Sequence, residues 1–154
     1  MPDSDSVQIL LVEDNPSDAE LTLHALRKSK LVNHILHVHD GAEALDFLFC
    51  RGAYAGRDAE KRPLLVLLDL KLPKVDGLQV LAEIKSDSRT KAIPVVLLTS
   101  SNEEQDRAIG YQRGVNSYIQ KPVNFADFQD VVLKLGMYWL IVNSKPPVRA
   151  FSNA

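Results

Sequence analysis

The sequence predicts an α/β fold in which helices cover both faces of a doubly wound, five-stranded parallel sheet. Five short segments rich in Val, Ile and Leu alternate with segments whose apolar residues recur at the spacing of a helix. Strands joined through helices run parallel, and right-handed connections place the helices on both faces. Three of the five segments are also nearly unbroken apolar runs, which is typical of strands buried on both faces. We therefore expect five strands and five helices.

The expected strands are VQILLVE (7–13), HILHVH (34–39), LLVLLDL (64–70), IPVVLLT (93–99) and SYIQ (117–120). The second of these alternates in character, with His37 and His39 two positions apart, so we expect it near an edge of the sheet. These two histidines and His34 have no evident fourth ligand, which argues against a metal site in this strand.

Helices are expected between the strands. Asn15 is a candidate N-cap with Pro16 at the first helical position, and SNEE at 101–104 has the pattern of a capping box. The charged stretch 51–63 has no apolar period and is interpreted as an exposed loop inserted before the third strand. The folded domain should span 7–143, and the tail 144–154, which contains two prolines, should be flexible.

Composition excludes several classes of protein. A chain of 154 residues favours one domain of ordinary size, with no room for a second catalytic or DNA-binding domain. A net charge of -2 indicates neither a nucleic-acid partner nor a membrane surface. No apolar run reaches the roughly 18 residues of a membrane helix, and the acidic start does not look like a signal peptide. With Cys50 as the one cysteine, a cytoplasmic location is expected.

Polar residues follow four of the five expected strands. Glu13 and Asp14 end the first, Asp69 ends the third, Thr99 ends the fourth and Lys121 follows the fifth. Carboxyl ends of parallel strands meet at one rim of the sheet, where ligands bind. Clustered carboxylates without Cys ligands suit octahedral Mg²⁺. The predicted chemistry is phosphoryl transfer to Asp69, with the cation, Lys121 and Thr99 neutralising the phosphoryl oxygens.

Four motifs resemble the signatures of the receiver domain of bacterial response regulators: LLVEDNPSD, LLDLKLPKVDG, VVLLTSS and YIQKP. The resemblance covers roughly residues 7–140 and implies the strand order 2-1-3-4-5. It further implies that Asp69 is the phosphoacceptor and that Glu13, Asp14, Asp69 and the main-chain carbonyl of Lys71 bind Mg²⁺. Such a domain takes part in a phosphorelay and has intrinsic self-phosphorylation and self-dephosphorylation chemistry, but is not otherwise an enzyme.

The same resemblance implies contacts around the phosphoryl group and a switch. Thr99 and Lys121 would contact the phosphoryl group, and the Lys121–Pro122 peptide bond would be cis. Tyr118 matches the position of the aromatic switch residue, which turns inward when Thr99 moves; its other interpretation is a half-buried aromatic residue in an edge strand. The surface of the fourth helix, fifth strand and fifth helix would carry the signal to a protein partner.

The C-terminal helix has more apolar surface than one stripe. Its expected inward face comprises Phe125, Phe128, Val132, Leu135 and Trp139, and MYWLIV at 137–142 is then apolar all round. We expect this surplus to form a homodimer together with the fourth helix and fifth strand, and intramolecular packing is the alternative. The expected interface residues are Phe128, Met137, Tyr138, Leu140 and Ile141.

The loop 51–63, the YWL sequence at 138–140 and the Pro-Pro pair that follows resemble the small response regulators that partner phytochrome histidine kinases. That resemblance implies a phytochrome-type kinase as the phosphodonor. The usual docking surface of the family is the first helix, here with Leu23 and Leu26, and the alternative is that these two residues pack on the sheet.

Three other classes of protein can be compared with these motifs. A phosphatase of the haloacid dehalogenase type needs a second Asp two residues after its nucleophile, where this chain has Lys71. A flavodoxin-like or nucleotide-binding protein needs a glycine-rich loop after the first strand, and EDNPSD contains no glycine. The alternative that stays open is a degenerate receiver that binds proteins without being phosphorylated.

Overall fold

Five parallel strands form one sheet in the order β2-β1-β3-β4-β5, as predicted. The computed structural model describes residues 7–29, 34–100, 115 and 117–136. The strands are β1 (Ile9–Val12), β2 (Ile35–Val38), β3 (Leu65–Asp69), β4 (Val95–Thr99) and β5 (Ser117–Gln120). Four of the five are shorter than expected by one or two residues at one or both ends, because the flanking residues leave the ladder.

Burial along the strands follows their place in the sheet. Every residue of β1, β3 and β4 is buried, which is the pattern of strands covered on both faces. In β2, at the edge, only Val38 is fully buried. The alternation of β2 therefore indicated its edge position correctly.

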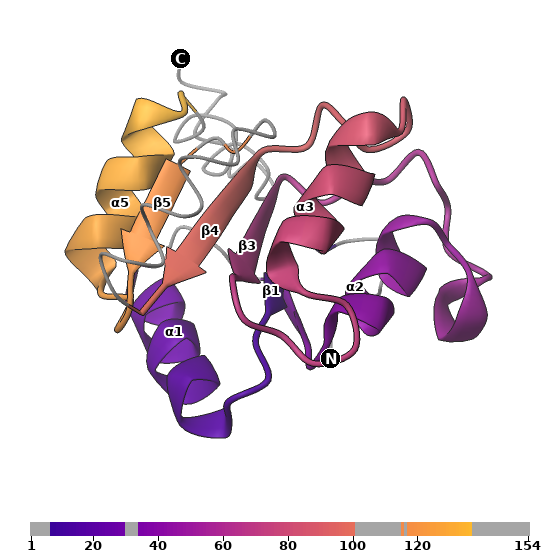
Figure 1. Ribbon diagram of the computed structural model, residues 1–154. Helices are drawn as coiled ribbons and strands as arrows, with labels where there is room; N and C mark the ends of the chain where they lie inside the picture. Colours follow the sequence, from indigo (N-terminus) through magenta and orange to yellow (C-terminus); the bar gives the residue numbers. More distant parts are fainter. Residues whose placement is uncertain (1–6, 30–33, 101–114, 116, 137–154) are drawn as a thin grey trace, which may run out of the picture.

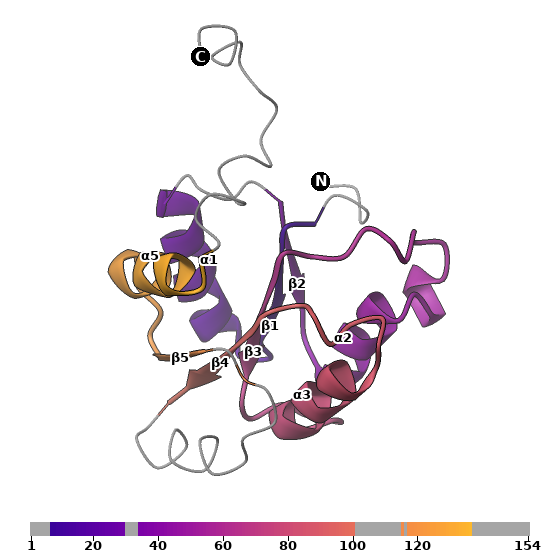
Figure 2. The same cartoon turned by 90° about the horizontal axis from the view of Figure 1, so that it is seen from above.

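Helices lie on both faces of the sheet (Figures 1 and 2). Those described are α1 (Pro16–Ser29), α2 (Gly41–Leu48), α3 (Gly77–Ser86) and α5 (Phe125–Lys134). In Figure 2, α1 and α5 cover one face, with a core around Leu26 and Phe128, and α2 and α3 cover the other, around Phe47 and Leu81. The helix expected from residue 101 lies outside the described residues. Among the described helices, none is long and apolar enough to cross a membrane.

The loop expected at 51–63 is more ordered than its composition suggested. It contains a short 3₁₀ helix, η2 (Gly52–Tyr54), and the Arg57 side chain is buried. The Arg57 guanidinium donates to the carbonyl oxygens of Phe47 at 2.6 Å and Lys61 at 2.7 Å, and lies 3.9 Å from the centre of the Phe47 ring. Most residues of 51–63 are exposed, as expected, and Arg57 is an exception whose buried charge these carbonyls satisfy.

The C-terminal helix corrects one expected interface residue. Phe128 is fully buried against the sheet together with Val132, while Phe125 and Leu135 are half-buried. A side chain without exposed surface cannot contact a second copy, so the placement of Phe128 in an interface is wrong. The other expected interface residues lie outside the described residues; they are Met137, Tyr138, Leu140 and Ile141. Trp139 and the tail 144–154 also lie outside them.

Candidate phosphoryl-acceptor site

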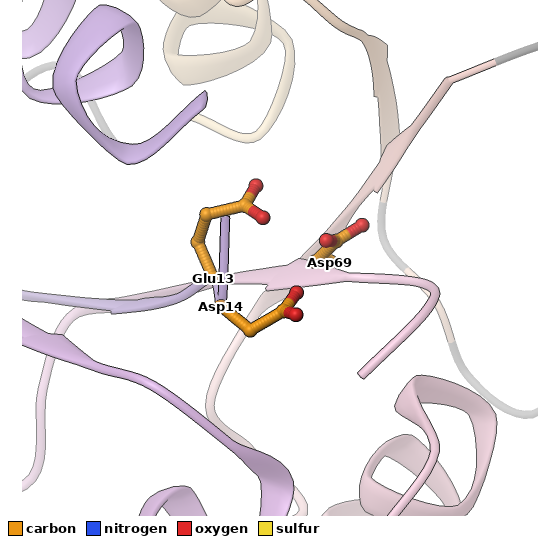
Figure 3. A group of neighbouring side chains, drawn as sticks. All are labelled: Glu13, Asp14 and Asp69. Atoms are coloured by element: carbon orange, nitrogen blue, oxygen red, sulfur yellow. The ribbon is translucent and has the colours of Figure 1, made fainter. Parts of the chain in front are cut away.

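Three carboxylates meet where β1 and β3 end (Figure 3). Glu13 and Asp14 directly follow β1, and Asp69 is the last residue of β3, the strand paired with β1. One ligand oxygen from each lies within 4.8 Å of the others; Glu13 and Asp69 are buried and Asp14 is exposed. At that distance and an effective dielectric of about 20, the ionised Glu13 and Asp69 repel by about 3.5 kcal/mol. The buried pair therefore requires a proton or a cation.

Without a cation, a proton on Glu13 meets this need. Burial, reinforced by a hydrogen bond to Asp69 and by its charge, raises the pKa of Glu13 to about 8. Burial also raises the pKa of Asp69, although the hydrogen bond from Glu13 and the nearby Lys121 oppose the shift. In the metal-free protein the raised pKa of Glu13 favours its protonated form near neutral pH, in which the carboxyl group donates to Asp69.

The same carboxylates fit a hard divalent cation. They offer oxygen ligands only, and the exposed Asp14 leaves an open side for water or a phosphoryl oxygen, as Mg²⁺ prefers. A bound cation would replace the proton on Glu13. When bound, it would supply positive charge against the oxygens of an incoming phosphoryl group.

Lys121 provides the fixed positive charge of the site. Its ammonium nitrogen lies 3.0 Å from an oxygen of Asp18, 3.2 Å from one of Asp69 and 3.4 Å from one of Glu13. Burial opposes the charge, but these carboxylates together hold the pKa of Lys121 above its usual range. Lys121 follows β5, and the Lys121–Pro122 peptide bond is cis, as the resemblance implies.

Thr99 ends β4 beside the acidic cluster, since its neighbour Leu98 pairs with Asp69. The Thr99 side chain is buried, and within the described part of the chain its hydroxyl oxygen has no hydrogen-bond partner. A buried hydroxyl without a hydrogen-bond partner destabilises the folded protein. The Thr99 hydroxyl can therefore gain a hydrogen bond by donating to an oxygen of a ligand at the site. Tyr118, the expected switch residue, lies half-buried in β5 opposite Leu97.

Glycine and an ion pair shape the loop between β3 and α3. A Cβ at Gly77 would collide with the carbonyl oxygens of Asp69 and Leu70, so α3 can begin this close to the strand end only with glycine. Lys74 has a positive φ of 66° and its ammonium lies 3.4 Å from Asp40, the N-cap of α2. This loop includes Lys71, whose backbone N–H donates to Asp69.

Two contacts of the site were not expected from the sequence. The Asp18 carboxylate, from the first turn of α1, reaches Lys121 across 103 positions of the chain. The ring of His37 donates from Nε2 to the carbonyl oxygen of Glu13 at 2.7 Å. The Asn-x-x-Asp pattern at 15–18 marks a helix start next to the acidic pair, so it could have shown that Asp18 lies close to the site. Nothing in the sequence singled out the contact of His37.

The family model of the response regulator receiver domain matches residues 9–133. The chain is 44% identical over 138 residues to the "Probable methanogenesis regulatory protein FilR2" of Methanothrix harundinacea, covering 90% of this chain and 86% of that protein. It is 42% identical over 132 residues to "Response regulator Rcp1" of Synechocystis sp., covering 86% and 88% of the two chains.

Solved structures agree with these relatives. The structure of "the bacteriophytochrome response regulator AtBRR" is 50% identical, with a TM-score of 0.81 over 90% of this chain and 96% of that one. The "Mn(2+)-bound form of response regulator Rcp1" is 38% identical, with a TM-score of 0.65 over 88% of each chain. Binding of a divalent cation is thus described for a homologue whose fold this chain shares.

Proposed function

The chain belongs to the response regulator receiver domain family, and on that premise we propose that it accepts a phosphoryl group onto Asp69 from the phosphohistidine of a sensor kinase. The observation that carries this proposal is the position of Asp69: its carboxylate is buried at the end of β3, next to two other acids and 3.2 Å from the Lys121 ammonium. The Lys121 ammonium favours the ionised form of this carboxylate and fixes its orientation, as a nucleophile requires.

In the proposed reaction an oxygen of Asp69 attacks phosphorus, the P–N bond to the donor histidine breaks, and the imidazole leaves and takes up a proton. Mg²⁺ held by Glu13, Asp14, Asp69 and the Lys71 carbonyl would neutralise charge on the phosphoryl oxygens. Lys121 stabilises one phosphoryl oxygen and the unpaired hydroxyl of Thr99 donates to another. Donation by Thr99 satisfies a group that is unpaired before the reaction.

We propose that the output is a change of surface around β5. A shift of Thr99 toward the phosphoryl group would vacate volume that Tyr118 can fill, because Tyr118 lies on the strand that pairs with β4. The face formed by β5, α5 and the expected fourth helix would then bind a second copy. Leu133 on α5 is 56% exposed and supports an apolar contact there.

The proposed donor is a kinase of the phytochrome type. The printed description of AtBRR as a bacteriophytochrome response regulator supports this, at 50% identity and almost full coverage of both chains. Transfer of radiolabelled phosphate from a purified bacteriophytochrome kinase to this chain should be faster than transfer from a histidine kinase of another class. Equal rates from both kinases would contradict a phytochrome partner.

Labelling with a small phosphodonor tests the acceptor itself. Incubation with acetyl phosphate and Mg²⁺ should add the mass of one phosphoryl group to the intact protein, and EDTA should prevent the gain. Asp69→Asn should gain nothing, whereas Asp130→Asn, at an exposed acid on α5, should be labelled like the wild type. A wild-type chain that is never labelled would favour the phosphorylation-independent interaction module.

Light scattering with and without beryllofluoride tests dimer formation, and a monomer under both conditions would refute it.

A further inference from the structure

We propose that Asp18 is a positioning residue that holds the Lys121 ammonium in the unphosphorylated protein and competes with the phosphoryl group for it. This inference rests on the proposed phosphoryl transfer to Asp69. It concerns a residue outside the acceptor, the metal ligands and the two groups that contact the phosphoryl oxygens.

The carboxylates around Lys121 already occupy its N–H donors. An ammonium has three N–H donors, and here three carboxylates surround it. Asp18 lies nearest, at 3.0 Å, ahead of Asp69 at 3.2 Å and Glu13 at 3.4 Å. A phosphoryl oxygen that approaches Lys121 must therefore displace one of three existing acceptors.

The three acceptors around Lys121 differ in how easily they can be displaced. The Glu13 side chain is fully buried and that of Asp69 is 5% exposed, so neither can find water when it loses the ammonium. The Asp18 side chain is 35% exposed and can be hydrated instead. Asp18 is thus the acceptor whose release costs least, and its hold on Lys121 opposes formation of the phosphorylated state.

The local structure at the start of α1 leaves the Asp18 carboxylate available for this contact. Asn15 caps α1 by accepting from the backbone N–H of Asp18 at 2.9 Å. In a capping box the acid at this third helical position reaches back to the N–H of the capping residue. Here that N–H donates to Glu13 at 3.2 Å instead. The Asp18 carboxylate is left to reach across the site from α1 to the residue after β5.

Beryllofluoride, which mimics the phosphoryl group, provides the test by titration calorimetry with saturating Mg²⁺. Asp18→Asn removes the competing charge and should tighten beryllofluoride binding by about two- to tenfold, a range between exposed and buried ion pairs. Glu20→Gln removes an equal charge from an exposed position on the same helix and should change the affinity less than about twofold. Asp18→Glu keeps the charge and should bind like the wild type.

A double-mutant cycle separates competition for Lys121 from a general field effect. In a Lys121→Met background, Asp18→Asn should leave beryllofluoride affinity unchanged. The proposal is overturned if Asp18→Asn binds no more tightly than the wild type, or if it strengthens binding equally with and without Lys121. A wild-type chain that is not labelled by acetyl phosphate would instead refute the proposed function, so the two failures are distinguishable.

Discussion

Raising the pH should destabilise the metal-free protein through Glu13. Burial and Asp69 raise the pKa of Glu13 from its ordinary 4.5 to about 8 in the folded protein. Between these values the folded protein binds more protons than the unfolded chain, so the free energy of unfolding falls as the pH rises. The stabilisation is complete below the lower value and is lost as the pH passes through the higher one.

The size of the effect follows from the same two pKa values. Glu13 has a pKa of 4.5 in the unfolded chain and of about 8 in the folded protein. Raising the pH from about 6 to about 8 therefore lowers its contribution to the free energy of unfolding by about 2 kcal/mol. The raised pKa of Asp69 acts in the same direction. Saturating Mg²⁺ should abolish the loss, because the ionised carboxylates then bind the cation.

Urea unfolding followed by circular dichroism, in EDTA and in Mg²⁺, measures this dependence. Glu13→Gln cannot ionise at this position and should lose most of the pH slope in EDTA, whereas Glu60→Gln, at an exposed glutamate of the loop before β3, should keep it. If the wild type and Glu13→Gln show the same slope in EDTA, Glu13 does not carry the proton assigned to it.

Three substitutions with matched controls test the packing and hydrogen bonding around the site. Gly77→Ala should lower the free energy of unfolding by about 1–3 kcal/mol, because the added Cβ would meet backbone carbonyls. Gly56→Ala, which has open space around it, should change the free energy of unfolding by less than about 0.5 kcal/mol. Equal effects of the two substitutions would contradict the close approach at Gly77. Arg57→Met should cost about 1–3 kcal/mol in urea unfolding by removing donors to two carbonyls, and Arg62→Met, which is exposed, should cost almost nothing. Thr99→Val removes the unpaired hydroxyl, so the unphosphorylated protein should be as stable as the wild type or up to about 1 kcal/mol more stable. The same substitution should weaken beryllofluoride binding in calorimetry. Unchanged binding would show that Thr99 does not contact the phosphoryl group.

Much of the site could be predicted because its residues stand at strand ends. A buried apolar run followed by a carboxylate is visible locally, as at Asp69 after β3. Parallel strands place all their carboxyl ends at one rim of the sheet, and the strand order that the resemblance implies sets β1 beside β3, so Glu13 and Asp69 could be expected to lie near each other. The Asn15 cap of α1 was likewise local information, because it depends on four consecutive residues.

Contacts between distant segments could not be predicted in this way. Whether Asp18 turns back to its own helix or across to Lys121 depends on where β5 ends relative to α1. Arg57 appeared to belong to an exposed loop, because nothing in its neighbours shows that two carbonyls converge on its guanidinium. The apolar period of α5 placed Phe128 on an apolar stripe but did not say whether the sheet or a second copy covers it.

The sequence by itself determined the parallel α/β architecture, the edge position of β2 and the residue types at the carboxyl ends of the strands. Alternation, helical period and polar residues at strand ends can each be recognised within a few neighbouring residues. Only the tertiary structure decided which carboxylates surround Lys121 and which arginine is buried. Those outcomes depend on distances of about 3 Å between groups that are far apart in the chain, and hydrogen bonds and desolvation vary steeply over such distances.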